Sequence, residues 1–171
     1  MTHKILIAGF GGQGILFLGK TLANLGLIQG KHVSWLPSYG PEMRGGTCNC
    51  NVIISDTEID SPLIEKPSLL IVMNQPSYTK FKERVAMGGK VFVDSALVTS
   101  DEKYSIPATT IATQAGHKRM ANMVVLGKLI KETNLATLEE VRKAFEVTIA
   151  DGKADLVELN MSLVKEGYDG N

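Results

Sequence analysis

Short apolar runs along the chain have the length and composition of buried β-strands. Five such runs predict strands at Lys4–Ala8, His32–Leu36, Thr47–Ser55, Ser68–Met73 and Lys90–Val93. The run at 68–73 is almost wholly apolar, which is typical of a central parallel strand covered on both faces. Two weaker signals predict a short return strand after the turn at 55–58, and an edge or irregular strand over Tyr104–Ala112, which contains Pro107.

Between the strands, apolar residues recur every three or four positions, the spacing that places them on one face of a helix. Helices are predicted at Ile15–Gln29, Pro76–Met87 and Met120–Glu132, behind a capping box at Thr137–Glu140, and around Leu156, Leu159 and Leu163. Strands that alternate with helices predict an α/β fold, here a single Rossmann-like, doubly wound and mostly parallel sheet flanked by helices. The first strand, the first helix and the second strand form a βαβ unit. No repeat or shift of composition divides the chain, so we expect one domain over residues 1–171.

The composition is that of an ordinary globular protein. Of 171 residues, 44% are apolar and 21% are charged, and 18 basic residues balance 18 acidic ones. A neutral chain offers no electrostatic reason to bind nucleic acid or an anionic membrane. No apolar stretch approaches the roughly 20 residues that span a bilayer, and the first residues do not resemble a signal peptide. We therefore expect a cytoplasmic protein that binds neither nucleic acid nor membrane.

A glycine loop, Gly9–Gly14, follows the first predicted strand and has the pattern G-x-G-x-x-G. Such glycines let a backbone approach a phosphate at the start of a helix. From the sequence alone, a tight strand-to-helix turn that binds nothing is the favoured interpretation of this pattern. A dinucleotide site would need an acidic residue at the end of the second strand, and the nearest acid, Glu42, lies in a loop that contains prolines. NAD or FAD binding is therefore disfavoured, and the missing Gly-Lys-Ser/Thr excludes a Walker A loop.

A second loop, Ser38–Thr47, follows the second predicted strand and has the sequence S-Y-G-P-E-M-R-G-G-T. In a doubly wound fold the carboxyl ends of parallel strands share one edge, so this loop should lie at the same edge as the first. Arg44 offers two parallel donors to a phosphate or carboxylate, and Gly45 and Gly46 could add backbone donors. An equally open interpretation is an ion pair between Glu42 and Arg44 that braces an exposed loop.

The other chemistry-bearing residues do not assemble into a catalytic set. Cys48 and Cys50 are too few for an iron–sulfur cluster, and on a strand they would pack as small free thiols. The three histidines have no metal-ligand spacing, and Ser95 lacks the glycines of a nucleophile elbow. A basic cluster at 117–119 could face an anion, but such clusters usually form a solvated face. The absence of catalytic groups favours a non-catalytic subunit.

The two glycine loops together resemble those of one enzyme family. The segments Gly9–Ile15 and Ser38–Thr47, with Asn122–Val124 and Leu126–Gly127 in a late helix, resemble the gamma subunits of 2-oxoacid:ferredoxin oxidoreductases of the 2-oxoglutarate or 2-ketoisovalerate type. The resemblance implies a complex that converts a 2-oxoacid and coenzyme A to acyl-CoA and CO2 while it reduces ferredoxin. It favours 2-oxoglutarate as the substrate and implies that the isolated chain is inactive.

The resemblance also implies cofactors and partners. Thiamine diphosphate, Mg²⁺ and iron–sulfur clusters are expected on other chains, because this sequence lacks the cysteines for clusters and a Gly-Asp-Gly diphosphate motif. Coenzyme A is expected as a substrate of the complex. The expected partners are the alpha, beta and delta subunits, and ferredoxin through the complex. An isolated chain could self-associate through its exposed interface.

The residues implied to face the coenzyme A or thiamine site belong to the two loops. They are Gly9, Gly11, Gly12, Gln13, Gly14, Ser38, Tyr39, Glu42, Arg44, Gly45, Gly46 and Thr47. No catalytic or metal-binding residue is expected on this chain. On this hypothesis Arg44→Ala should weaken the use of coenzyme A by the complex. Two alternatives stay open: a stand-alone nucleotide-binding Rossmann protein, and an interaction module whose loops touch no cofactor.

Overall fold

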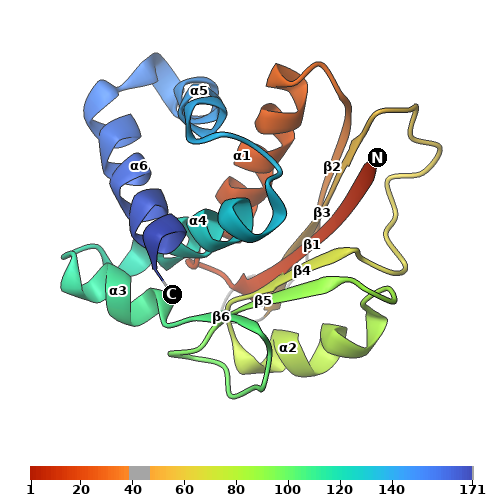
Figure 1. The fold of residues 1–171 in the computed structure, drawn as a ribbon, viewed down its shortest axis with the longest axis horizontal. Helices are drawn as coiled ribbons and strands as arrows, with labels where there is room; N and C mark the ends of the chain where they lie inside the picture. Colours follow the sequence, from red (N-terminus) through yellow and green to blue (C-terminus); the bar gives the residue numbers. More distant parts are fainter. Residues whose placement is uncertain (39–46, 171) are drawn as a thin grey trace.

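A six-stranded sheet forms the centre of the computed structural model, which describes residues 1–38 and 47–170 (Figure 1). The strand order is β2-β3-β1-β4-β5-β6. The strands are β1 (Thr2–Phe10), β2 (His32–Ser38), β3 (Thr47–Ser55), β4 (Leu69–Val72), β5 (Lys90–Asp94) and β6 (Tyr104–Ile106). β1, β4, β5 and β6 pair in parallel, whereas β3 runs antiparallel to both β1 and β2. The predicted mostly parallel sheet is confirmed, with β3 as its reversed strand.

The reversed strand brings the two loop regions to one edge of the sheet. β3 lies between β1 and β2, so the predicted βαβ unit spans one intervening strand. In the register of the sheet, Phe10 pairs with Thr47, and Ser38 pairs with Asn49. The end of β1, the end of β2 and the start of β3 therefore meet at the edge where the parallel strands end. We call this edge the carboxyl edge.

Helices cover both faces of the sheet, which confirms the doubly wound arrangement (Figure 1). The α-helices are α1 (Ile15–Ile28), α2 (Gln75–Phe81), α3 (Ala108–Gln114), α4 (Ala121–Thr133), α5 (Leu138–Thr148) and α6 (Ala154–Asp169). Single 3-10 turns are η2 (Lys82–Arg84), η3 (Lys118–Met120) and η4 (Ala150–Gly152). α1, α4, α5 and α6 lie on one side, and α2 lies on the other. The predicted capping box is present, since Thr137 and Glu140 satisfy each other's backbone N–H groups at the start of α5.

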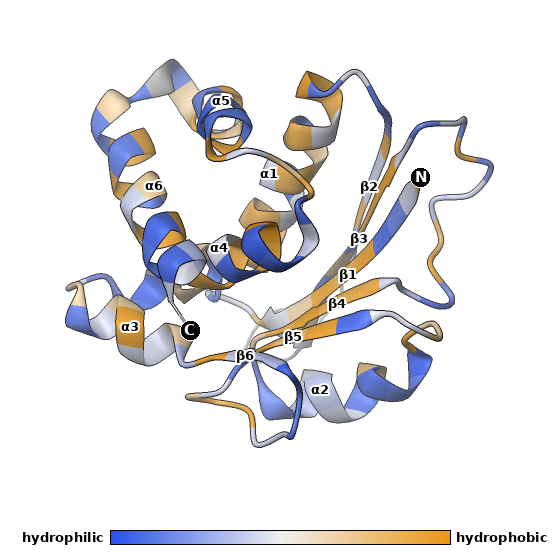
Figure 2. Ribbon diagram, in the orientation of Figure 1, coloured by the Kyte–Doolittle hydropathy of each residue, from blue (hydrophilic) through white to orange (hydrophobic). Residues whose placement is uncertain are grey.

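The two faces of the sheet bury different side chains, because successive strand residues point to opposite sides. Ile5 and Ile7 join the larger core beneath α1 and α4, whereas Leu6 joins a smaller core with Tyr78 and Phe81 of α2. The central strands are accordingly hydrophobic along much of their length (Figure 2). Each fully buried aliphatic side chain contributes roughly 1.5–3 kcal/mol. Burial on both faces explains why the run at 68–73 is apolar throughout.

Helices α4 and α6 pack backbone to backbone. A Cβ atom on Gly127 of α4 would overlap the carbonyl oxygen of Val164, and one on Gly167 of α6 would overlap the carbonyl oxygen of Val124. Neither oxygen belongs to a side chain that could turn away. The two glycines therefore set how closely the helices approach, which gives a physical reason for glycine at the Leu126–Gly127 motif.

The predicted strand over 104–112 is wrong beyond Ile106. Pro107 has no N–H to continue the ladder, and α3 begins directly after it. The carboxylate of Asp94 accepts hydrogen bonds from the backbone N–H and the hydroxyl of Thr109. These bonds satisfy donors in the first turn of α3, so the segment is helical where its β-branched residues predict a strand.

The predicted helix over 76–87 is shorter than expected. α2 ends at Phe81, and the 3-10 turn η2 replaces its last part. The guanidinium of Arg84 donates to the carbonyl of Ile64 at 2.6 Å, and the N–H of Ala86 donates to the carbonyl of Pro67 at 2.8 Å. These contacts with the preceding loop divert the chain away from the helix axis.

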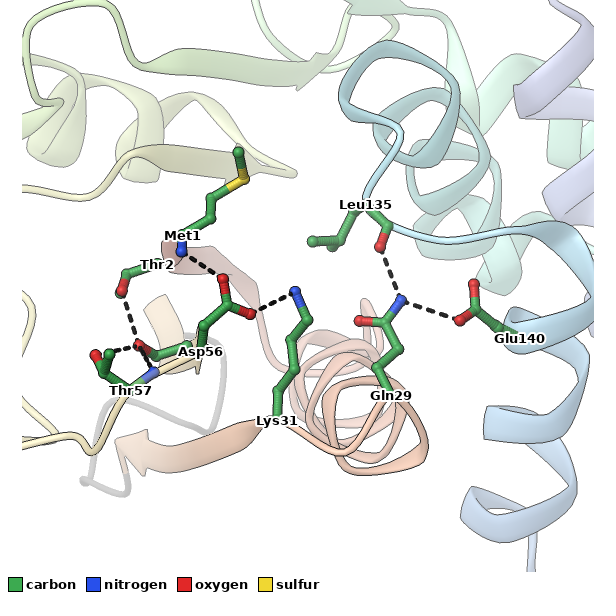
Figure 3. A network of polar contacts seen from close by, with 9 residues as sticks. Met1, Thr2, Gln29, Lys31, Asp56, Thr57, Leu135 and Glu140 are labelled. Carbon is green, nitrogen blue, oxygen red and sulfur yellow. Dashed lines mark hydrogen bonds and ion pairs between the residues drawn. The ribbon is translucent and has the colours of Figure 1, made fainter.

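The predicted return strand after residues 55–58 is also wrong, since residues 56–68 form no strand. Both sides of β3 are already paired, with β1 and with β2, so no edge is free for it. Polar contacts hold the turn instead (Figure 3): Asp56 contacts the backbone nitrogen of Met1 and lies 3.1 Å from Nζ of Lys31. In the same view, Nε2 of Gln29 donates to the carbonyl of Leu135 at 2.9 Å and so ties α1 to the connection before α5.

Candidate functional site

The first glycine loop forms a turn between the end of β1 and the start of α1. Gln13 holds this turn through both ends of its amide. The N–H of Phe10 donates to Oε1 of Gln13 at 2.7 Å, and Nε2 of Gln13 donates to the carbonyl of Met73 at 2.9 Å. Gln13 therefore links the ends of β1 and β4. Both ends of its amide make a hydrogen bond within the protein, so Gln13 positions the turn, and its expected contact with a ligand stays a prediction.

Two of the predicted site glycines are needed for packing. A Cβ on Gly9 would lie 2.7 Å from Oε1 of Gln13 and from Cδ1 of Ile15, closer than side chains pack. Gly14 caps α1 in the left-handed conformation, with φ 71°, and a Cβ there would overlap the side-chain amide of Asn122. Nδ2 of Asn122 donates to the carbonyl of Gly14 at 3.1 Å. The turn is thus fastened to the start of α4.

The other two glycines of the loop are open to solvent. Gly11 and Gly12 lie in the exposed part of the turn. Gly12 has φ 91°, and nothing lies within 4 Å of the position that a Cβ would take. This glycine is required for backbone conformation and leaves space beside the chain. A ligand could therefore approach the backbone at Gly12, whereas Gly9 is buried and the side chain of Asn122 fills the Cβ position of Gly14.

The second glycine loop lies mostly outside the described residues. This applies to Tyr39, Glu42, Arg44, Gly45 and Gly46. Its flanking residues are described: Ser38 ends β2, and Thr47 begins β3 opposite Phe10. Both flanks reach the carboxyl edge, as the sequence predicts. The proposed contacts of Arg44 and its neighbours stay predictions.

A cavity of about 410 Å³ opens beside the glycine turn. We call it the basic cavity, because two cationic side chains line it. Its lining residues are Gly12, Gln13, Met73, Leu97, Thr109, Lys118, Arg119 and Ala121. Lys118 and Arg119 come from η3, directly before α4. The sequence favours a solvated face for this basic cluster, and only the fold shows that two of its residues border a cavity.

Asp94 does not line the basic cavity but holds Thr109, which does. This carboxylate ends β5 and is 0% exposed. It accepts hydrogen bonds from the N–H of Ala96 at 3.1 Å and from the hydroxyl of Thr109 at 2.5 Å, in addition to the N–H of Thr109. Buried carboxylates need such donors, since an unpaired buried charge is costly. Asp94 therefore positions Thr109 in the cavity wall.

The cysteines are buried free thiols, as the sequence predicts. Both belong to the core that residues of α1 share. Burial raises the pKa of Cys50 to about 12 from its ordinary value of 9.0, and it also raises the pKa of Cys48. Thiolates are the form that binds metals, so these side chains do not fit an iron–sulfur cluster. Among residues 1–38 and 47–170, no three His, Cys, Asp or Glu side chains gather as metal ligands. No helix in these ranges is long and apolar enough to cross a membrane.

The fold and its carboxyl edge define a Rossmann-like α/β domain. Its glycine turn is held by the side chains of Gln13 and Asn122 and borders the basic cavity. The particular family follows from comparison with known sequences. Residues 4–170 match the family described as pyruvate ferredoxin/flavodoxin oxidoreductase, and the chain belongs to this family.

Relatives of two kinds match nearly the whole chain. The ketoisovalerate oxidoreductase subunit VorA of Methanothermobacter thermautotrophicus is 39% identical over 97% of this chain and 36% of its own length. The 2-oxoglutarate synthase subunit KorC of Methanocaldococcus jannaschii is 36% identical over 99% of this chain and 94% of its own length. The chain thus spans about a third of the VorA relative and almost all of KorC.

A solved structure has the same fold over the same length. The gamma subunit of a keto/oxoacid ferredoxin oxidoreductase from Geobacter sulfurreducens is 29% identical and superposes with a TM-score of 0.83. The match covers 99% of this chain and 95% of that subunit. The predicted resemblance to gamma subunits is confirmed.

Proposed function

We propose that this chain works as the gamma subunit of a 2-oxoacid:ferredoxin oxidoreductase and has no activity alone. The carrying observation is the end-to-end match to a relative of subunit size, because KorC aligns over 94% of its length. The described residues also lack a metal-ligand cluster, so this part of the chain has no means to hold an iron–sulfur cluster. The reaction of the complex is the oxidative decarboxylation of a 2-oxoacid with coenzyme A, coupled to the reduction of ferredoxin.

The proposed substrate is 2-oxoglutarate. Sequence identity separates the two kinds of relative poorly, at 39% for VorA and 36% for KorC. The preference for 2-oxoglutarate is supported by KorC, which matches 99% of this chain at 36% identity. The side-chain pocket for the oxoacid is built chiefly by other subunits on this proposal.

The proposal includes the setting of the subunit. Alpha, beta and delta chains are its partners, and they hold thiamine diphosphate, Mg²⁺ and the iron–sulfur clusters. The complex acts in the cytoplasm, and residues 1–171 contribute one domain to it. The carboxyl edge faces the coenzyme A and thiamine sites, since the glycine turn and both flanks of the second loop reach this edge. Glycine backbones there allow close approach of a phosphorylated substrate.

The first experiment is affinity purification of the tagged chain from its native host without oxygen. Mass spectrometry is expected to find a thiamine-binding chain and a cysteine-rich chain in the eluate. The purified complex should then reduce ferredoxin with 2-oxoglutarate and coenzyme A faster than with 2-ketoisovalerate or pyruvate. A matched control is the untagged strain carried through the same purification.

Two outcomes would count against the proposal at different levels. If the partner chains are present in the cell but absent from the eluate, the subunit assignment fails. The glycine turn would then be tested for a nucleotide of its own. If the complex forms but prefers 2-ketoisovalerate, only the substrate assignment fails.

A further inference from the structure

We propose that two copies of this chain associate through strand β2 and helix α1, with the two β2 strands paired antiparallel. The pairing joins the two six-stranded sheets into one continuous sheet. This interface goes beyond the proposed function, which does not state how many gamma subunits contact each other. It uses the outer side of β2, which we call the free edge, and no residue that lines the basic cavity. The choice of partner follows from the backbone groups of β2 and from the side chains of α1 beside it.

β2 is the outermost strand of the sheet, and among the described residues its only neighbouring strand is β3 (Figure 1). None of its seven residues is buried. Proteins usually protect a sheet edge by keeping the strand short or by placing charged side chains on it. The opposite edge strand, β6, has three residues, whereas β2 has seven and carries no Asp, Glu, Lys or Arg. A long, exposed and uncharged edge is a template for pairing with a further strand.

The register of the sheet shows which way the backbone of Pro37 points. The carbonyl of Ala8 accepts from the N–H of Met73 at 2.9 Å, so Ala8 is directed at β4 and the preceding residue, Ile7, is directed at β3. Ile7 pairs with Cys50, whose backbone groups are therefore directed at β1 and away from β2. Pro37 lies opposite Cys50 in the pair of β2 and β3. Its nitrogen, which carries no hydrogen, therefore points to the free edge, where a proline is tolerated.

Val33 and Trp35 have the same orientation as Pro37, because backbone groups alternate in direction along a strand. Their N–H and C=O groups therefore point to the free edge, and they have no backbone partner within the described residues. In an antiparallel pair of strands, two opposite residues can exchange both of their hydrogen bonds. Placing Val33 of one copy opposite Trp35 of the other uses all of these groups and does not need the N–H that Pro37 lacks.

This register is symmetric, which favours a second copy as the partner. When Val33 of the first copy lies opposite Trp35 of the second, Trp35 of the first lies opposite Val33 of the second. The twofold axis then passes beside Ser34. A twofold interface uses the same surface of both copies and is the commonest arrangement in protein dimers. Because β2 has no charged side chain, two copies of it meet without repulsion between like charges.

Helix α1 lies directly on β2. A Cβ atom on Gly26 would lie 2.7 Å from Cγ2 of Val33, and one on Gly19 would lie 3.0 Å from Nε1 of Trp35. The two glycines therefore let the helix approach the outermost strand closely. One flank of α1 borders the free edge as a result, so a second copy that pairs with β2 also meets this helix.

An apolar strip runs along a flank of α1 that neither the sheet nor α5 covers. Phe17 and Asn24 contact α5 on another flank. The strip consists of three residues that recur at steps of seven and four and so share one face of the helix: Leu16, Ala23 and Leu27. Leu27 is 60% exposed although it is apolar, and pairing of the two copies would bury it. Lys20 borders the strip, and its long side chain can keep the ammonium group in water.

The first test is sedimentation of the purified full-length chain at several concentrations. We expect a reversible association with a limiting mass of twice the 18.5 kDa of one chain. Residue-resolved hydrogen exchange then locates the contact. The amides of Val33 and Trp35 should be protected in the dimer and should lose this protection on dilution. The amides of Ser34 and Leu36, which face β3, should stay protected in both states.

Charge substitutions test the two parts of the interface separately. Leu27→Lys should weaken the association about tenfold or more, since burial of a leucine side chain contributes at least that factor. Val147→Lys is the matched control, because Val147 is 63% exposed on α5, and it should have little effect. Ser34→Lys gives β2 the charge that an edge strand usually carries and should also weaken the association. Circular dichroism checks that each variant is folded.

Four results would overturn the proposal. These are a chain that stays monomeric at every concentration, rapid exchange at Val33 and Trp35 in the dimer, association that Ser34→Lys leaves unchanged, and equal losses with Leu27→Lys and Val147→Lys. If the two amides are protected only in the purified oxidoreductase complex, a strand of another subunit is the partner and the second copy is not. These results would leave the subunit assignment untouched, because that assignment rests on co-purification.

Discussion

The two halves of helix α4 show two uses of glycine. At its N-terminal end, Asn122 holds the glycine turn through a side-chain hydrogen bond, and Gly12 of that turn faces open space. In its middle, Gly127 lies against the backbone of α6 with no room for any side chain. The glycine turn at the N-terminal end of α4 is held by side-chain hydrogen bonds beside a cavity, and a substitution can remove each of these bonds. The middle of α4 is shaped by contact between main chains, which cannot move aside without separating two helices.

The difference teaches what a glycine motif does and does not show. Gly9 and Gly14 belong to a pattern that suggests phosphate binding, yet both are explained by packing. Gly12 combines a positive φ with empty surroundings, as Gly30 also does, and its place beside the basic cavity is what sets it apart. A glycine whose surroundings are filled excludes a side chain, whereas one whose surroundings are open is required only for its backbone conformation.

The largest effect should come from adding a side chain where the helices touch. Gly127→Ala is expected to lower the free energy of unfolding by about 3 kcal/mol, because overpacking against backbone outweighs the roughly 1 kcal/mol gain in helix propensity. Urea denaturation measures it. Gly30→Ala is the control, since its φ is 71° but nothing lies nearby, and it should cost only about 1 kcal/mol. If Gly127→Ala and Gly30→Ala lose the same free energy of unfolding, then α4 and α6 can move apart without penalty.

A smaller effect should follow from releasing the glycine turn. Asn122→Ala removes the donor to the carbonyl of Gly14 and leaves this half-buried acceptor without its partner, at a cost of about 2 kcal/mol. Hydrogen exchange of the amides at 11–14 should speed up in this variant. Asn160→Ala is matched in type and burial but loses only a bond to Leu156 within α6. If exchange at the turn is unchanged by Asn122→Ala, Gln13 alone is sufficient to hold it.

The smallest effect concerns the exclusion of water from the buried thiol of Cys50, beneath the glycine turn. Sγ of Cys50 lies 3.7 Å from the carbonyl of Ile15, in the first turn of α1. The folded pKa of Cys50 is raised to about 12. The neutral thiol of Cys50 therefore contributes fully to the free energy of unfolding below the unfolded pKa near 9.0. This contribution is lost as the pH rises toward 12.

Between pH 8 and pH 10, the wild type should lose about 1 kcal/mol more unfolding free energy than Cys50→Ala. The difference between the two proteins cancels the titration of other groups. Denaturation in urea at both pH values supplies the measurement. Parallel losses would mean that water reaches the thiol and that the region under the turn is less enclosed than the α4–α6 contact.

Local signals in the sequence determined the elements and the fold class. The apolar runs predicted five strands, the spacing of leucines predicted the long helices, and Thr137 with Glu140 predicted the cap of α5. These signals act over a few residues, so they can be recognised in the sequence without knowledge of the fold. They are misleading where distant groups intervene, as at Thr109, whose donors are satisfied by Asp94. They also give no indication that β3 inserts between β1 and β2.

The tertiary structure decided which residues of the candidate site serve the protein and which face outward. Gln13 reaches Met73 across 60 positions of the sequence, and Gly14 meets Asn122 across 108. The same folding brings Lys118 and Arg119 beside Gly12 and forms the basic cavity. The sequence by itself determined the strands, the helices, the glycine turn and the resemblance to a family, because each depends on neighbouring residues. The purpose of each glycine depended on the space around it, and only packing between distant segments creates or fills that space.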